Sequence, residues 1–222
     1  MQIVNLTYFQ KQNFLNIPLA TPVPYGIEVP SNQGYLDMAC IRIEREVLLR
    51  ALGVTLWKQK EALTAASIQL PENVRWLRLI EGEEYRNSEN EQDDELKWNG
   101  LKYDYSLIAY RVFEEFTTDT NIRLTATGAS QVDSENAVKA TPMYLISTAN
   151  NNFIKEYQGE TFNTGYGRGY NNIYGFSEEF LDYFDSEVER CLYAYLVDKK
   201  ADFPEWDYTK FRFYDTKNSF GL

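Results

Sequence analysis

Regularly spaced apolar residues between positions 105 and 116 constrain the fold of this chain more than any other feature. They are Tyr105, Ile108, Ala109, Val112, Phe113 and Phe116. This i, i+3, i+4, i+7, i+8, i+11 series forms one continuous stripe on a helix. We therefore expect an amphipathic helix with Asp104 as its N-cap, and with Glu114 and Glu115 facing away from the stripe.

The same reasoning predicts three helices before this one. The first spans about 36–52 with Gly53 as its C-cap, and the second spans about 55–66. Pro71 opens the third, because proline suits a first helical turn. The inward residues expected for the first are Leu36, Cys40, Ile43, Val47 and Ala51, and those for the third are Val74, Leu77 and Ile80.

Two further helices are predicted in the second half of the chain. One follows Thr141-Pro142, and the other runs from a Ser177 cap to about Lys200. Their expected buried faces are Ile146, Ala149, Phe153 and Tyr157 for the former, and Leu181, Phe184, Val188, Cys191, Leu192 and Tyr195 for the latter. Pro204 ends any continuation of the last helix.

Strand signals are few and short. Ile122, Leu124 and Ala126 alternate with polar residues, which predicts one strand that needs a pairing partner, in this protomer or a neighbour. Residues 3–9 and 208–214 are weaker strand candidates. The expected fold is therefore mainly α, a bundle of four or five helices with a small β element, an extended N-terminal arm and long loops.

We divide the chain into three parts. They are an extended N-terminal arm at 1–35, a helical domain at 36–200 with an acidic loop (81–95) and a Gly/Tyr-rich loop (159–176), and an aromatic C-terminal docking segment at 201–222. Proline density makes the arm extended, and it lies either on a neighbour or on its own surface. The C-terminal docking segment packs on its own helices or on a partner.

The absence of histidine excludes more chemistry than any other aspect of composition. It removes the commonest general base, the commonest zinc ligand and every Ser-His or Cys-His nucleophile pair. The acidic pairs Glu83-Glu84, Glu114-Glu115 and Glu178-Glu179 fall at solvated positions, which is unsuited to two-carboxylate catalysis. We expect no enzyme activity, no cofactor and no metal site.

Charge and hydropathy narrow the set of partners. A net charge of −11 opposes general binding to nucleic-acid phosphates, and it suits either plain solubility or a wall past which DNA slides. Residues 1–20 lack the pattern of a secretory signal, and no apolar run is long enough to span a membrane. Cys40 and Cys191 are expected as reduced core thiols, with a disulfide between them left open.

Three pieces of sequence carry a family resemblance. They are Trp98-Asn99-Gly100-Leu101 before the helix that starts near Ser106, Glu135-Asn136-Ala137 before Thr141-Pro142, and the C-terminal run from Phe203-Pro204-Glu205-Trp206 to Phe220-Gly221-Leu222. With the early helix at Ile41-Arg42-Ile43-Glu44, they resemble the small helical head–tail connector (adaptor, neck-ring) proteins of tailed bacteriophages. The resemblance is to versions from Bacteroides-like phages, including crAss-like phages, and it covers about two thirds of the chain.

The resemblance implies a structural virion protein made in the host cytoplasm. Such subunits form a closed homo-oligomeric ring, typically twelve-fold, at the portal vertex. The ring binds the portal protein and the next tail or neck protein, and genomic DNA passes through its channel without specific binding or any contact with a membrane. The candidate interface residues are the motif residues Trp98, Asn99 and Gly100, the loop tyrosines Tyr166, Tyr170 and Tyr174, and the C-terminal Trp206 and Phe220.

Other functions remain open from the sequence. The same chain could be another neck or tail-completion protein of the virion. A carbohydrate-binding module would use exposed Tyr and Trp platforms, usually on a β-sandwich, and a carboxylate hydrolase would need two acids in one cleft. The tyrosines of the 159–176 loop suit protein contact, because tyrosine buries a large area and keeps a polar tip, but the loop could equally pack on itself.

Overall fold

The computed structural model describes residues 1–10, 15–17, 31–86, 95–125, 128–131, 143–159 and 189–214. Its α-helices are α1 (Ser31–Glu61), α2 (Val74–Glu81), α3 (Leu107–Asn121), α4 (Met143–Gln158) and α6 (Leu192–Asp198). Its strands are β1 (Glu83–Arg86), β2 (Glu95–Trp98), β3 (Ile122–Thr125) and β4 (Gly128–Gln131). The chain is therefore mainly helical with a small β element, as the sequence predicts.

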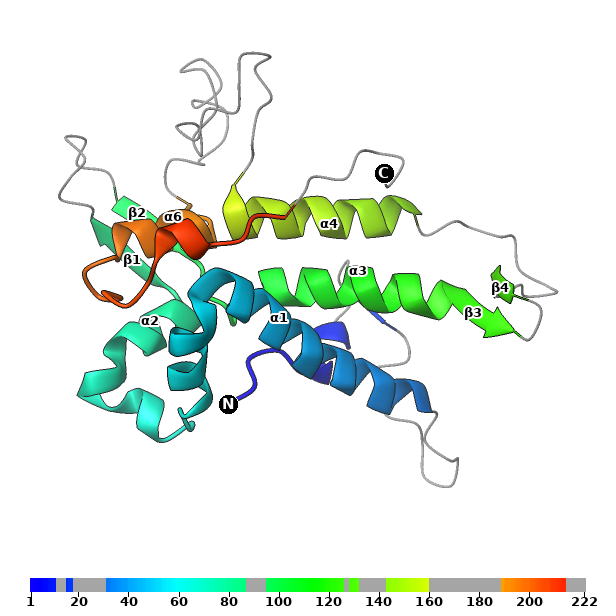
Figure 1. Cartoon of the computed structure of the whole chain (residues 1–222), viewed down its shortest axis with the longest axis horizontal. Helices are drawn as coiled ribbons and strands as arrows, with labels where there is room; N and C mark the ends of the chain where they lie inside the picture. Colours follow the sequence, from blue (N-terminus) through cyan, green and yellow to red (C-terminus); the bar gives the residue numbers. More distant parts are fainter. Residues whose placement is uncertain are drawn as a thin grey trace, which may run out of the picture.

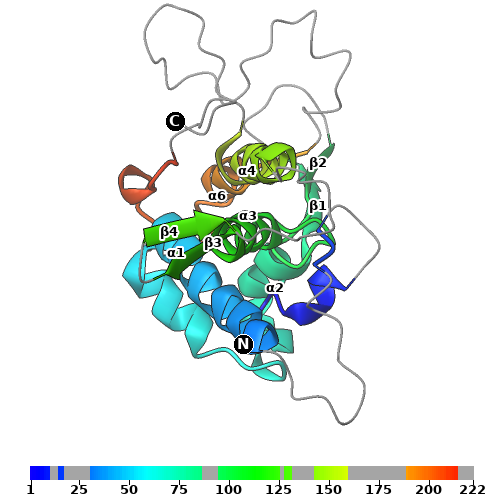
Figure 2. The ribbon, with the colours of Figure 1, turned by 90° about the vertical axis from the view of Figure 1, so that its right-hand side faces the viewer.

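Helix α3 occupies the centre of the molecule. It packs against α1 on one side and α4 on the other, so these three helices form successive layers (Figures 1 and 2). The predicted stripe is confirmed at Ile108, Val112 and Phe116, which are buried. This arrangement leaves the outer faces of α1 and α4 on opposite sides of α3.

The ends and polar face of α3 differ from the prediction. Its cap is Ser106, whose Oγ accepts from the Ile108 N–H at 3.2 Å and donates to the Leu101 carbonyl at 2.6 Å. Tyr105 precedes the helix and is exposed. The prediction for Glu114 was wrong, since it is buried, where an ion pair with Arg111 at 2.6 Å supplies the countercharge.

Helix α1 is longer than predicted and broken in the middle. It begins at Ser31 rather than 36, and its buried stripe matches the predicted one. Gly53 ends the regular helix, as predicted, with φ 76° and ψ 171°, a region open almost only to glycine. The second half then runs to Glu61, so the predicted helix over 55–66 is shorter than expected.

Helix α2 buries a different face from the one predicted. Its buried residues are Trp76, Leu79 and Ile80, whereas Val74 and Leu77 are only partly buried. Residues 71–73 form a 3-10 turn (η4, Pro71–Asn73) before α2, as the proline suggests. The difference arises because Trp76 has the largest apolar surface of the helix and takes the core position, packed edge-on against Phe203.

The N-terminal residues form no strand, so the prediction for 3–9 was wrong. Residues Leu6–Phe9 make a 3-10 helix (η1), and the Asn5 side chain caps it by accepting from the Thr7 N–H at 3.0 Å. An asparagine that bonds to the backbone two residues on favours a turn over an extended strand. Apolar side chains of this region are buried in the core: Ile3, Val4, Tyr8 and Phe9.

Both strand pairs are antiparallel hairpins. Strand β1 pairs with β2, with Glu83 opposite Trp98, so the predicted acidic loop 81–95 contains β1 and ends at the first residue of β2. Residues 87–94 lie outside the described residues. Strand β3 pairs with β4, with Ile122 opposite Gln131, so the predicted strand finds its partner within the protomer.

The last helix is much shorter than predicted. Cys191 has extended φ and ψ of −69° and 163°, and its sulfur caps α6 by accepting from the Ala194 N–H. Glu189 forms an isolated bridge with Lys97, so a single helix from Ser177 to Lys200 is wrong. Residues 177–188 lie outside the described residues, and Cys40 and Cys191 are both free thiols.

Two other predictions concern α4 and the chain after α6. In α4 the expected Ala149, Phe153 and Tyr157 are buried, but Ile146 is only partly buried. Thr141 and Pro142 lie outside the described residues. The weak strand candidate at 208–214 was wrong. Residues Tyr208–Lys210 form a 3-10 turn (η6), whose start is capped by Asp207 accepting from the Thr209 N–H at 3.1 Å.

Candidate interface

The predicted interface motif at Trp98 belongs to the interior of the protomer. Trp98 is buried, its Nε1–H donates to the Leu79 carbonyl at 2.9 Å, and its ring stacks on Tyr195 with centroids 5.2 Å apart. Asn99 is half-buried and Gly100 is buried. The assignment of Trp98 to a surface contact is therefore corrected, because a fully packed indole with its N–H satisfied has no face left for a partner.

Gly100 has an architectural reason for being glycine. Its φ is 90°, and a Cβ there would lie 2.5 Å from backbone atoms of Glu81 and Gly82. Gly82 has a φ of 93°, and a Cβ there would lie 2.5 Å from the Trp98 carbonyl oxygen. Two glycines thus let the chain cross the end of α2, and the crossing is fixed by Lys102 N–H donating to the Ile80 carbonyl at 2.8 Å.

Trp206 is likewise an internal anchor. It is buried, and its Nε1–H donates to the Ala51 carbonyl at 2.8 Å. The other predicted interface residues, Tyr166, Tyr170, Tyr174 and Phe220, lie outside the described residues. The described part of the C-terminal docking segment, 201–214, therefore packs on its own helices.

Two side chains of α4 and one backbone carbonyl of α1 hold this segment by its backbone. The Gln158 amide bonds twice to one residue, donating to the Tyr214 carbonyl at 2.9 Å and accepting from its N–H at 2.8 Å. Tyr157 Oη–H donates to the Arg212 carbonyl at 3.2 Å, and Arg212 N–H donates to the Arg50 carbonyl at 3.2 Å. The segment thereby bridges the two outer helices across α3.

The Tyr214 ring completes this attachment. Its centroid lies 4.3 Å from the Arg50 guanidinium carbon and 4.8 Å from the Phe153 ring. Burial raises the pKa of the Tyr214 phenol to about 12. The residue is thus a neutral aromatic anchor that combines ring packing with a cation–π contact.

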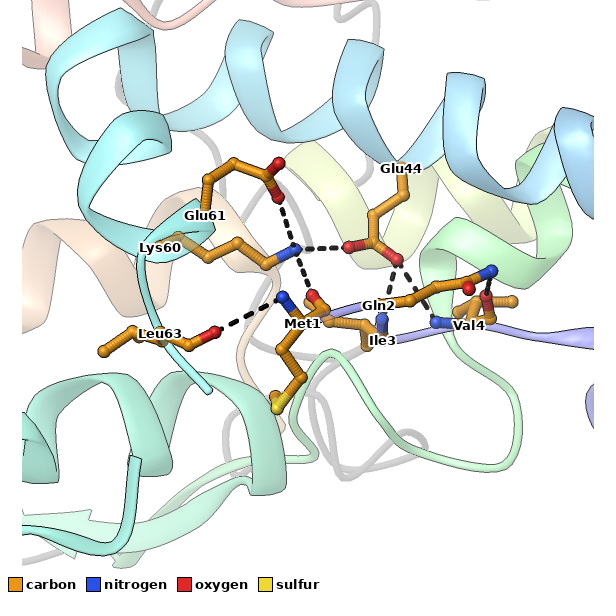
Figure 3. A network of polar contacts seen from close by, with 8 residues as sticks. All are labelled: Met1, Gln2, Ile3, Val4, Glu44, Lys60, Glu61 and Leu63. Atoms are coloured by element: carbon orange, nitrogen blue, oxygen red, sulfur yellow. Dashed lines mark hydrogen bonds and ion pairs between the residues drawn. The ribbon is translucent and has the colours of Figure 1, made fainter. Parts of the chain in front are cut away.

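A second attachment holds the N-terminal residues, and Figure 3 shows its polar network. The Glu44 carboxylate accepts from the Ile3 N–H at 2.8 Å and from the Val4 N–H at 3.3 Å. Lys60 pairs with the same carboxylate and donates to the Met1 carbonyl at 2.8 Å. We call Glu44 and Lys60 the clamp.

The clamp is a buried ion pair that acts on backbone atoms. The side chains of Glu44 and Lys60 are 4% and 2% exposed, so each charge has lost most of its water and needs a partner of opposite sign. Exposed Glu61 is a second partner of Lys60, with its carboxylate 3.6 Å from the ammonium nitrogen. Around the clamp, each buried apolar side chain of the first nine residues contributes about 1.5–3 kcal/mol. The clamp itself fixes where the first residues lie along α1, because it bonds to backbone groups of Met1, Ile3 and Val4.

Sequence reasoning missed both members of the clamp. The signal was present in the helical pattern: Glu44 lies four residues after Cys40 and four before Leu48, on the apolar face of α1. Lys60 likewise lies four residues after the buried Leu56. An acid and a base on an apolar face indicate a buried pair. Gln158 gave no comparable signal.

Large apolar side chains remain exposed on the two outer helices. Met38 of α1 is 66% exposed and Tyr144 of α4 is 77% exposed. Their exposed neighbours are Tyr35 and Ile41 on α1 and Leu145 on α4. These two groups, which we call the α1 patch and the α4 patch, lie on the helices that flank α3 (Figure 2). Exposed clusters of this kind mark contact surfaces more often than isolated apolar residues do.

One acidic group has a strongly shifted pKa. Burial, and then the charge of Glu189, raise the pKa of the Glu156 carboxyl to about 7, while Lys155 lowers it. Within the described part of the chain, no three His, Cys, Asp or Glu side chains form a group able to hold a metal ion. No helix there is both long enough and apolar enough to cross a membrane.

Comparisons with known proteins add no relative. No family model, no curated protein and no solved structure matches this chain.

Proposed function

We propose that this protein is a head–tail connector subunit of a tailed bacteriophage. Copies of it form a closed ring at the portal vertex, join the capsid portal to the tail and continue the DNA channel. Its role is geometric and electrostatic, without bond chemistry. The protein is made in the host cytoplasm and works in the virion neck.

The observation that carries the proposal is that exposed apolar groups lie on both of the helices that pack against α3. A closed ring requires a heterologous contact, in which one surface of a subunit meets a different surface of the next. The α1 patch (Tyr35, Met38, Ile41) and the α4 patch (Tyr144, Leu145) are two such surfaces. Tyrosine and methionine suit this contact, since both are enriched in interface cores.

Charge supports the same role. The chain carries 33 acidic and 22 basic residues. Acidic side chains that face a channel repel DNA phosphates, so DNA moves past without binding. The carbohydrate-module alternative is less favoured, because its aromatic platforms usually stand on a β-sandwich and this chain is mainly helical.

Co-sedimentation with portal particles of the same virus tests the proposal. We expect the wild-type chain to sediment with the portal. Met38→Asp or Tyr144→Asp should each lower the bound amount about tenfold or more, because a charge would be buried in the contact between copies. Val54→Asp, at another exposed apolar residue beyond the Gly53 break, is the matched control.

Two results would count against these assignments. A folded wild-type chain that never sediments with the portal would overturn the connector proposal. If both aspartate variants bound the portal as well as wild type does, the connector proposal would stand, but the two patches would not be its contact surfaces. Circular dichroism on every variant separates lost contact from lost folding.

A further inference from the structure

We draw no further inference here: the strongest candidate, the exposed apolar surface on α6 and the described part of the C-terminal docking segment (Val197, Tyr208 and Phe213), carries none, because nothing in the structure shows what covers it.

Discussion

Glu44 and Lys60 lie sixteen residues apart on the two halves of α1, and their side chains form a buried ion pair. The same two side chains bond to the backbone of residues 1–4. In a straight helix, sixteen residues separate two positions by about 24 Å along the axis. The break at Gly53 turns the second half back, so that Lys60 reaches Glu44. One backbone conformation therefore creates the place where the N-terminal residues are held.

Gly53→Ala is expected to destabilise the fold by about 1–3 kcal/mol. The position has open space for a Cβ, so the whole cost comes from forcing alanine into a φ of 76° with ψ near 171°. Urea unfolding measures the difference. Gly34→Ala is the matched control: it also has open space but lies in regular helix, so it should be neutral or stabilising by up to about 1 kcal/mol. Equal effects at the two positions would disprove the requirement at Gly53.

Lys60→Met is expected to cost about 3–5 kcal/mol of unfolding free energy, because it leaves the Glu44 carboxylate buried without its partner. Adding Glu44→Gln should recover part of that loss, since the glutamine oxygen can still accept from Ile3 N–H without carrying a charge. Chemical denaturation of the two single variants and the double variant gives the coupling. Strict additivity would show that the pair is not coupled.

Gly100→Ala is expected to destabilise by about 3 kcal/mol or more, because positive φ and a 2.5 Å approach to the backbone of Glu81 and Gly82 act together. Trp98→Phe should cost less, about 1–2 kcal/mol, through loss of the bond to the Leu79 carbonyl while the ring stack on Tyr195 remains. Thermal melts of both variants make the comparison. A Gly100→Ala protein as stable as wild type would contradict the crossing described here.

The pH dependence of stability should contain a component from Glu156. Its folded-state pKa, about 7, lies above the ordinary value of 4.5. The folded state therefore binds the extra proton between these values, and stability from this group falls as pH rises from about 4.5 to 7, by about 1–3 kcal/mol. Glu156→Gln should remove that slope and stabilise the protein at pH 8. Exposed Glu72→Gln, the control, should leave the slope unchanged.

The helical periodicities were predictable because each depends on a local repeat. The stripes of α1 and α3 are buried where the spacing places them, for example at Ile43 and Val112. The predictions fail where a distant partner decides the outcome. Glu114 is buried and paired with Arg111, which balances its charge. The long last helix is interrupted at Cys191, next to the Glu189 bridge with Lys97.

The candidate interface was harder to predict than the fold. Large aromatic residues in a recognisable motif favour an interface role for Trp98 and Trp206, but each indole N–H has a carbonyl partner inside the protomer. The Gln158 amide forms hydrogen bonds with the backbone of Tyr214, 56 residues away in the sequence, and no local pattern predicts this contact. Exposure of Met38 and Tyr144 likewise depends on how α1 and α4 pack on α3.

The mass of the complex formed with portal particles, measured by light scattering after removal of unbound protein, tests the connector proposal most directly. The proposal predicts a discrete complex that contains the same whole number of chains per portal particle in every preparation, matched to a closed ring. A portal particle of unchanged mass, or a continuous spread of bound copies, would contradict it.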